Sequence, residues 1–177
     1  MAAYTTNITG NEPVTLAEMK LYLRVDHDAE DALIGELITA AREWAETHTE
    51  KAIVQQSVTA YFDQFTREIE LPLGNVNSVT AIRSDGDVLA PESYRLLVGS
   101  PSAVYFIGTL PRAEDGSQSI EVEYSAGYAE APKRIKQAIK IMVADMYEHR
   151  EAQVIGQTVA ENATLERLLF PVRELTL

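Results

Sequence analysis

The sequence of 177 residues contains no cysteine. A disulfide framework, a thiolate nucleophile and a cysteine-ligated zinc site are therefore excluded. Histidine is nearly as rare, with three residues that lie far apart in the chain. The patterns of phosphate-binding loops, dinucleotide-binding turns and nucleophile elbows are missing too. These absences remove several enzyme classes at once.

Long hydrophobic runs are also missing. No segment approaches the roughly 20 apolar residues that a membrane-spanning helix needs. The opening residues, MAAYTTNITG, lack the basic start and the apolar stretch of a signal peptide. We therefore expect no membrane association, and a protein that stays in the cytoplasm in which it is made.

Positively charged residues are few relative to negatively charged ones. The chain has 15 lysine and arginine residues against 27 aspartate and glutamate residues, a formal net charge of −12. Specific binding to duplex DNA is disfavoured, because it relies on basic surfaces. An acidic surface suits ordinary solubility, and it also suits a passage through which DNA slides without adsorbing. With 46% hydrophobic and 24% charged residues, the composition is that of a soluble globular protein.

Helical periodicity begins after an irregular start. Residues 1–13 show no periodicity and predict a flexible N-terminal arm that either frays or docks on a neighbour. Thr15 and Glu18 form a capping box that starts a first helix, and Asp28 is the predicted N-cap of a second helix. The second helix has a broad apolar stripe of Leu33, Ile34, Leu37, Ile38, Ala41, Trp44, Ala45 and His48. Such a stripe can cover a core on one side and a neighbouring subunit on the other.

Residues 53–125 change to a period of two, which is typical of β-strands. Ile120, Val122 and Tyr124, for example, alternate with glutamates. The Asp85–Gly86 pair predicts a tight hairpin, because glycine accepts a positive φ. Further turns are predicted at Gly99-Ser100-Pro101 and at Asp115-Gly116. We expect five to seven short antiparallel strands.

The helical pattern returns after Gly127, with Pro132 in the first turn of a third helix that ends near Arg150. Its apolar stripe consists of Ile135, Ala138, Ile139, Met142, Val143 and Met146. A polar stretch over 153–161 follows, and then a short amphipathic segment that Pro171 ends.

The predicted fold class is α+β, with a small bundle of three main helices plus a short C-terminal helix and an inserted antiparallel β region. The predicted divisions are a flexible arm over 1–13, a helical bundle over 14–52 and 126–152, a β insertion over 53–125 and a C-terminal docking segment over 153–177. A linker that carries a short apolar segment is typical of a docking element. The alternative is that the leucines of this segment fold back onto the core.

Asp26-His27-Asp28 is the strongest catalytic candidate, since an imidazole between carboxylates can serve as a metal ligand or a general base. It has no second ligand at a recognisable spacing, and aspartates at a helix start are expected as caps. Asp85-Gly86-Asp87 lacks the further oxygen ligands of a calcium loop. We predict no catalytic, cofactor-binding or metal-binding residue, and no enzymatic activity.

Four basic residues gather near the start of the third helix, where the helix dipole disfavours cations. These residues are Lys133, Arg134, Lys136 and Lys140. One interpretation is a solvated basic face. The other is a contact with an acidic face of a neighbouring copy or with DNA phosphate.

Several phrases together resemble one family. They are VTLAEMKLYLRVDHDAEDALIGELITAAREWAETHT at 14–49, YSAGYAEAP at 124–132, KQAIKIMVADMYEHREA at 136–152 and LERLLFPVR at 165–173. In this order, with a β-rich stretch after the first, they resemble the head-tail connector (adaptor) proteins of long-tailed bacteriophages, prophages and gene transfer agents. The β region matches no fixed motif of that family.

The resemblance implies a structural protein of the virion neck, which forms a dodecameric ring beneath the portal and extends the DNA channel. The ring would receive head-closure or tail proteins, and DNA would pass through it non-specifically. The segment that docks on the portal would comprise Leu165, Leu168, Leu169, Phe170 and Arg173. The second and third helices would supply subunit contacts, with Trp44 and the four basic residues as candidates.

Two alternatives stay open at this point. The chain could be another neck component, such as a head-closure or tail-terminator protein. Less favoured is a non-viral ligand-binding or enzymatic α+β domain that uses Asp26-His27-Asp28 and the loop from Tyr124 to Tyr128.

Overall fold

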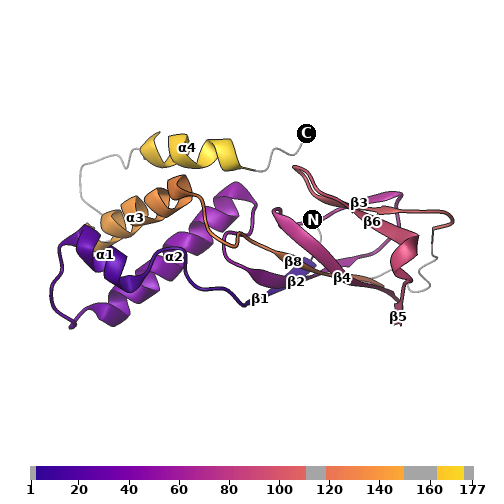
Figure 1. The fold of residues 1–177 in the computed structure, drawn as a ribbon, viewed down its shortest axis with the longest axis horizontal. Helices are drawn as coiled ribbons and strands as arrows, with labels where there is room; N and C mark the ends of the chain where they lie inside the picture. The colour runs from indigo at the N-terminus through magenta and orange to yellow at the C-terminus, as the bar shows by residue number, and fades with distance from the viewer. Residues whose placement is uncertain (1–2, 111–118, 150–162, 174–177) are drawn as a thin grey trace. The chain divides into compact units, whose positions relative to one another are not determined.

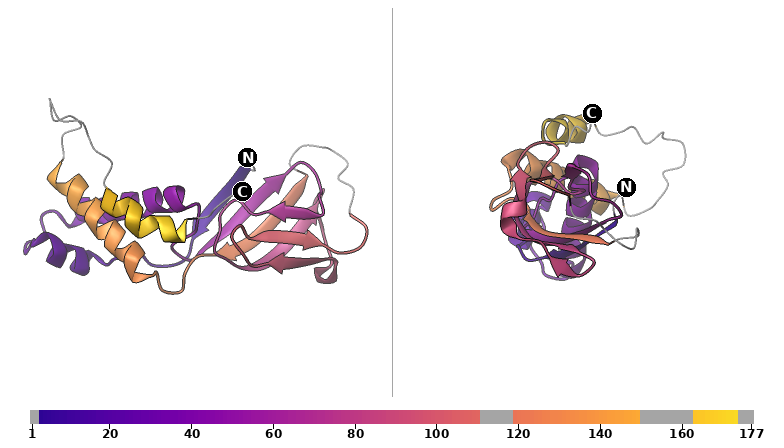
Figure 2. Two further views of the ribbon diagram at one scale, coloured as in Figure 1. Left: turned by 90° about the horizontal axis from the view of Figure 1, so that it is seen from above. Right: turned by 90° about the vertical axis from the view of Figure 1, so that its right-hand side faces the viewer.

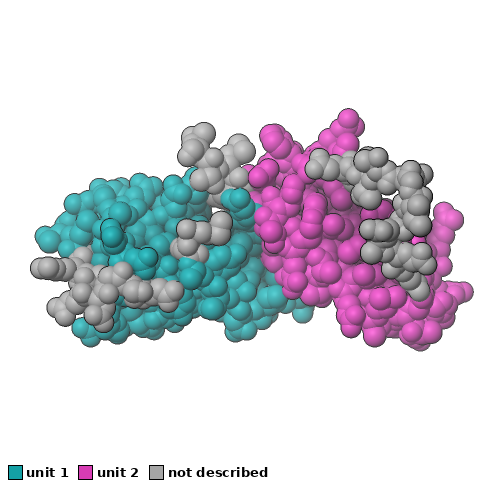
Figure 3. Space-filling model, turned by 180° about the vertical axis from the view of Figure 1, so that it is seen from behind, with its two compact units in different colours: residues 1–11, 50–129, 174–177 teal, residues 12–49, 130–173 magenta. Residues whose placement is uncertain are grey.

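The computed structural model describes residues 3–110, 119–149 and 163–173 (Figure 1). The chain divides into two compact units, which Figure 3 colours separately. The β unit comprises residues 1–11, 50–129 and 174–177, and the helical unit comprises residues 12–49 and 130–173. Helices and antiparallel sheets occupy different parts of the chain, so the predicted α+β class is confirmed.

Four α-helices make up the described part of the helical unit: α1 (Leu16–Leu23), α2 (Asp31–Thr49), α3 (Lys133–Glu148) and α4 (Ala163–Leu169). A short 3-10 turn, η2 (Phe170–Val172), follows α4. The predicted capping box is confirmed, because the Glu18 N–H donates to the Thr15 hydroxyl while the Thr15 N–H donates to the Glu18 carboxylate. The largest fully buried side chains of this unit are Val14, Met19, Ile34, Ile135, Ile139 and Leu169.

The start of the second helix differs from the prediction. α2 begins at Asp31 rather than at Asp28. The Asp28 carboxylate instead lies 2.6 Å from the Lys20 ammonium, which also lies 2.7 Å from Asp31. A charge pair with Lys20 of the preceding helix therefore replaces the predicted cap. Within the broad apolar stripe of α2, the buried positions are Ile34, Ile38, Ala41 and Ala45, and the others are only partly buried.

The β unit contains two antiparallel sheets. The larger has the order β1-β2-β8-β4-β5, built from Ala3–Ile8, Gln56–Phe62, Ile120–Ala126, Val76–Ser84 and Asp87–Val88. The smaller has the order β3-β7-β6, built from Glu68–Glu70, Ala103–Phe106 and Tyr94–Leu97. A short 3-10 turn, η1 (Pro91–Ser93), precedes β6. The predicted hairpin joins β4 to β5, with φ values of 52° at Asp85 and 90° at Gly86. The predicted turn at Asp115-Gly116 lies outside the described residues.

The N-terminal arm is a second difference from the prediction. Residues Ala3–Ile8 form β1, which pairs along its whole length with β2. The segment AYTTNI contains the aromatic and β-branched residues that strands favour. All six residues are exposed, and Tyr4 and Ile8 are the only large apolar side chains among them, so the segment lacks a clear period of two by which a strand could be recognised.

The core of the β unit includes the inward-facing residues of β8, among them Val122 and Tyr124. The Tyr124 hydroxyl accepts a hydrogen bond of 3.3 Å from the Leu73 N–H, so this buried polar atom has a partner. Burial in the apolar core raises the pKa of Tyr124. Directly after β8, Gly127 has a φ of +110° and lies against the backbone of Val54.

We predict that Gly127→Ala lowers the free energy of unfolding by about 3 kcal/mol, because the residue combines a positive φ with close backbone contact. A Cβ atom at this position would lie 2.0 Å from the Val54 carbonyl oxygen. The matched control is Gly35→Ala in α2, where nothing lies within 4 Å of the added atom. The control should be neutral or stabilising by up to about 1 kcal/mol. Urea unfolding followed by circular dichroism measures both, and equal stabilities of the two variants would contradict the prediction.

Candidate assembly surfaces

The C-terminal helix α4 is held by two of the residues that the sequence assigned to docking. Leu165 and Leu169 are 8% and 0% exposed, and α4 packs along α3 within the helical unit (Figure 2). Phe170 is 61% exposed, Arg173 is exposed and Leu168 is half-buried. The i, i+4 spacing of the two buried leucines places both on the attached side of the helix. The predicted docking set therefore divides into two parts. The anchoring pair is Leu165 and Leu169, and the outward group is Leu168, Phe170 and Arg173.

A stacked pair on α2 adds a polar contact to α4. The rings of Trp44 and His48 lie 4.9 Å apart with an interplanar angle of 10°. His48 Nε2 lies 3.2 Å from a carboxylate oxygen of Glu166 on α4. This contact becomes an ion pair when the imidazole is protonated. Trp44, a predicted interface residue, is thus partly buried beside a residue that contacts α4.

The four basic residues of α3 also divide into two pairs. The Lys136 ammonium lies 3.4 Å from Glu130, and the Lys140 ammonium lies 3.9 Å from Glu18. Lys133 and Arg134 are exposed, and neither has an ion-pair partner among the described residues. The hydrogen bond from the Thr15 backbone lowers the pKa of Glu18, and Lys140 adds to this effect. Lys136 and Lys140 therefore each lie near a carboxylate of the helical unit, whereas Lys133 and Arg134 are exposed cations with none among the described residues.

Arg42 is a residue that the sequence reasoning missed. Its side chain is 2% exposed, and its Nε atom lies 3.1 Å from both carboxylate oxygens of Glu12. Its terminal nitrogens lie 2.7 Å from Glu46 and 3.4 Å from Glu43. Burial alone would lower the pKa of Arg42, but Glu46 and Glu12 outweigh burial and raise it. A charge inside the apolar stripe of α2, with glutamate four residues later, was the signal available in the sequence.

In the catalytic candidate Asp26-His27-Asp28, His27 and Asp28 contact different residues. Asp28 pairs with Lys20, and His27 Nε2 lies 4.0 Å from Glu30. Among residues 3–110, 119–149 and 163–173, no group of three or more histidine and carboxylate side chains is arranged to hold a metal ion. No helix in these same ranges has the length and apolarity required to cross a membrane.

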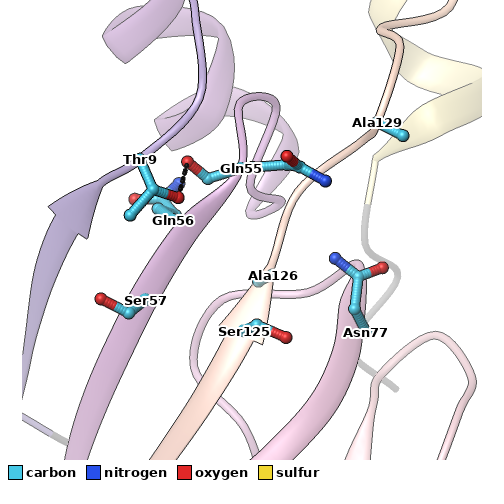
Figure 4. Close-up of a pocket in the computed structure, with 8 residues that line it drawn as sticks. All are labelled: Thr9, Gln55, Gln56, Ser57, Asn77, Ser125, Ala126 and Ala129. Carbon is cyan, nitrogen blue, oxygen red and sulfur yellow. Dashed lines mark hydrogen bonds between the residues drawn. The ribbon is translucent and has the colours of Figure 1, made fainter.

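A shallow groove of about 460 Å³ lies on the β unit (Figure 4). Its lining is uncharged and comprises Thr9, Gln55, Gln56, Ser57, Asn77, Ser125, Ala126 and Ala129. The Asn77 amide donates 2.9 Å to the Gly127 carbonyl, and the Thr9 hydroxyl donates 3.1 Å to the Gln55 carbonyl. These side chains offer hydrogen bonds but no group suited to acid-base chemistry near neutral pH.

A model of the family described as head completion protein matches residues 12–171. No curated protein matches the sequence. Similar solved chains occur in the virion of a native gene transfer agent particle (23% identity, TM-score 0.80) and in the neck of an empty particle with C6 symmetry (23%, 0.79). A third occurs in the neck of a native particle with C12 symmetry (21%, 0.76). Each comparison covers 98% of this chain and 97% of the other, and at these identities it shows a shared fold.

We predict that Arg42→Met destabilises the helical unit by about 3 kcal/mol, because the substitution leaves Glu12 and Glu46 without their buried cation. The chain has a single tryptophan, Trp44 on α2, so its fluorescence during urea unfolding reports this unit. Arg134→Met is the matched control, since the same change removes an exposed arginine. The control should lie within about 0.5 kcal/mol of the wild type. A similarly small effect of Arg42→Met would show that the buried cluster does not stabilise the unit.

Proposed function

The chain belongs to the head completion protein family, and on this premise we propose that it is a neck component of a tailed phage or phage-like particle. Its specific role in the proposal is that of the head-tail connector, or adaptor. Copies of the chain form a ring beneath the portal, extend the DNA channel and join the head to the tail. This role is mechanical and requires no catalytic residue or cofactor.

The observation that carries the proposal is the extent of the likeness. The family match over residues 12–171 includes the four helices α1 to α4 and residues 50–129 of the β unit. The similar chains in gene transfer agent particles agree over 98% of this chain, and two of those structures are necks. The C12 symmetry of one neck supports a dodecamer for this chain as well. A ring of identical copies needs two different surfaces on each copy.

For the contact with the portal, we favour the outward group at the end of α4. Leu168, Phe170 and Arg173 retain exposed surface while Leu165 and Leu169 anchor the helix. An exposed phenylalanine beside a half-buried leucine is typical of an interaction surface. The arginine can contribute a charged hydrogen bond at the margin of such a contact. The portal is therefore expected to bind an element that is already ordered in the free chain.

For the channel, the relevant property is charge. A net charge of −12 disfavours adsorption of DNA phosphate, so DNA can move through a ring without being held. Lys133 and Arg134 are better suited to an acidic surface of the neighbouring copy, because they are exposed cations on a strongly acidic protein. The proposed location is the virion neck, after synthesis in the cytoplasm of the host bacterium.

A head-closure or tail-terminator protein is the alternative within the same class. Portal binding separates the two roles, since the connector contacts the portal directly and a tail terminator contacts the tail.

The test of a role in the neck is electron microscopy of particles made without this chain, with mass spectrometry of the wild-type particle. Separate heads and finished tails, with DNA lost from the heads, are expected. Joined and DNA-filled particles would contradict a role in the neck.

We predict that Phe170→Asp abolishes binding to the portal without unfolding the chain, because it places a charge in an apolar contact. Co-purification of the variant with isolated portal rings measures binding, and circular dichroism checks the fold. Val98→Asp is the matched control, since Val98 is 76% exposed and lies in the β unit. The control should bind as the wild type does. Full binding by Phe170→Asp would exclude this surface as the docking site.

We further predict that joint reversal of Lys133 and Arg134 to glutamate weakens ring formation by about tenfold at low salt. The loss should shrink as salt is raised, because screening reduces the attraction in the wild type. Analytical ultracentrifugation on the portal template measures assembly. Arg24→Glu reverses another exposed arginine in the helical unit and should assemble as the wild type does. Arg24→Glu changes the net charge by half as much as the double reversal, so a weakening about half as large would point to total charge rather than to this contact.

A further inference from the structure

We propose that the five-stranded sheet continues from one copy to the next, through antiparallel pairing of the outer edge of β1 with β4 of a neighbouring copy. This inference rests on the proposed ring and adds a named contact between its subunits. It concerns the β unit, for which the sequence offered no role.

The outer edge of β1 presents backbone groups in a regular order. β1 pairs with β2 from Ala3 to Ile8 without a register shift, and the Thr9 N–H continues the same register by donating 2.9 Å to the Gln55 carbonyl. Hydrogen-bonded and non-hydrogen-bonded pairs alternate in an antiparallel ladder. The N–H and C=O groups of Tyr4, Thr6 and Ile8 therefore point away from β2. No strand in the described ranges pairs with them.

The opposite edge of the same sheet is also largely open. β4 has nine residues, but β5 pairs only with Arg83 and Ser84. One further bond, from the Leu89 N–H to the Ile82 carbonyl, extends that hairpin. Over residues 76–81, β4 has no strand partner on the side away from β8 within the part of the chain that the structure describes. Among the described residues, each copy thus offers two edge segments without a strand partner, as a ring contact between two different surfaces requires.

The strand directions of the sheet fit such a junction. β1, β2, β8 and β4 alternate in direction, since each neighbouring pair is antiparallel. The two outer strands of this group of four therefore run in opposite directions. When the next copy continues the sheet in the same orientation, its β4 lies antiparallel to β1. An odd number of long strands would instead have required a parallel junction.

The side chains at both edges favour pairing. Neither AYTTNI in β1 nor VNSVTA over residues 76–81 contains a charged residue or proline, although charged residues make up 24% of the chain. Natural sheet edges are usually guarded by such residues. Tyr4 and Ile8 are each 44% exposed and lie opposite the buried Ala60 and Gln56, so they extend the core face of the sheet. A continued sheet would bury this apolar surface.

β4 also presents an apolar side chain on the same face as those of β1, and its bulges favour closure of the ring. Val79 is partly buried and pairs with the buried Tyr124, which places it on the same core face. The register between β4 and β8 shifts between Val76 and Ser78 and again between Val79 and Ala81. Such bulges bend a strand and increase its twist. A bent edge favours a closed, curved arrangement of copies over an extended flat sheet.

The first test uses the absence of cysteine. A chain with Thr6→Cys and Val79→Cys carries one thiol on each proposed edge, and both thiols lie on the core face because Thr6 pairs with Val58 and Val79 with Tyr124. Within one copy β1 and β4 are separated by β2 and β8, a distance of about 14 Å, which a disulfide cannot span. Mild oxidation of assembled particles should give a ladder of covalent multimers of this chain on a non-reducing gel. Either single variant should give no species larger than a dimer.

The second test removes one outward donor. Thr6→Pro lacks the N–H at the free edge but keeps the bonds of β1 to β2, and it should weaken ring formation by about tenfold. Thr6→Val keeps the N–H and should assemble as the wild type does. Circular dichroism and the unfolding midpoint show whether β1 persists in both variants. A loss of assembly in Thr6→Pro with an unchanged midpoint supports the junction.

The outcomes separate this inference from the proposed function. If particles contain the chain in the neck but the double-cysteine variant gives no ladder, the continued sheet is wrong and the connector role stands. Cross-linking of Thr6→Cys to a different neck protein would likewise overturn pairing between copies. If the chain is absent from particles altogether, the proposed function fails first.

Discussion

A buried positive charge sets much of the order in the helical unit. Arg42 lies inside the packed face of α2, where an unpaired guanidinium would be costly, and three glutamates surround it. Glu43 and Glu46 belong to the same helix, but Glu12 lies outside it, at the first residue of the unit. The need to pair one cation therefore fixes where the chain enters the unit. Thr39 also donates a hydrogen bond of 3.2 Å to Glu12, which strengthens this attachment.

The attachment of α4 depends on apolar burial rather than on a buried charge. Apolar burial of Leu165 and Leu169 holds the helix, and the contact between His48 and Glu166 adds a polar link to α2. This division leaves one side of a short helix for another partner. A helix that is already ordered loses less conformational entropy on binding than a free segment does. In the function proposed above, such an arrangement suits docking of identical copies on one template.

For contacts with other chains, the β unit offers backbone hydrogen-bonding groups at its strand edges, whereas the helical unit offers side chains. Its core is closed by apolar residues of both sheets, and Gly127 allows close approach of the chain to Val54 at the end of β8. In the larger sheet, β1 and residues 76–81 of β4 contain none of the charged residues or prolines that often guard an edge. Surfaces of both kinds fit a protein whose role, in the function proposed above, is assembly.

The sequence by itself determined the features that depend on neighbours along the chain. The capping box of Thr15 and Glu18, the Asp85–Gly86 hairpin and the α+β class were predictable, because each arises from local backbone geometry or from periodicity. Tertiary structure decided which part of the broad stripe on α2 is buried, that Asp28 pairs with Lys20, and that Ala3–Ile8 forms a strand. Periodicity cannot distinguish two sides of a wide apolar stripe, and a strand whose residues are all exposed carries no burial pattern. These outcomes depend on contacts between residues distant in sequence, whose energies exist only once the chain is folded.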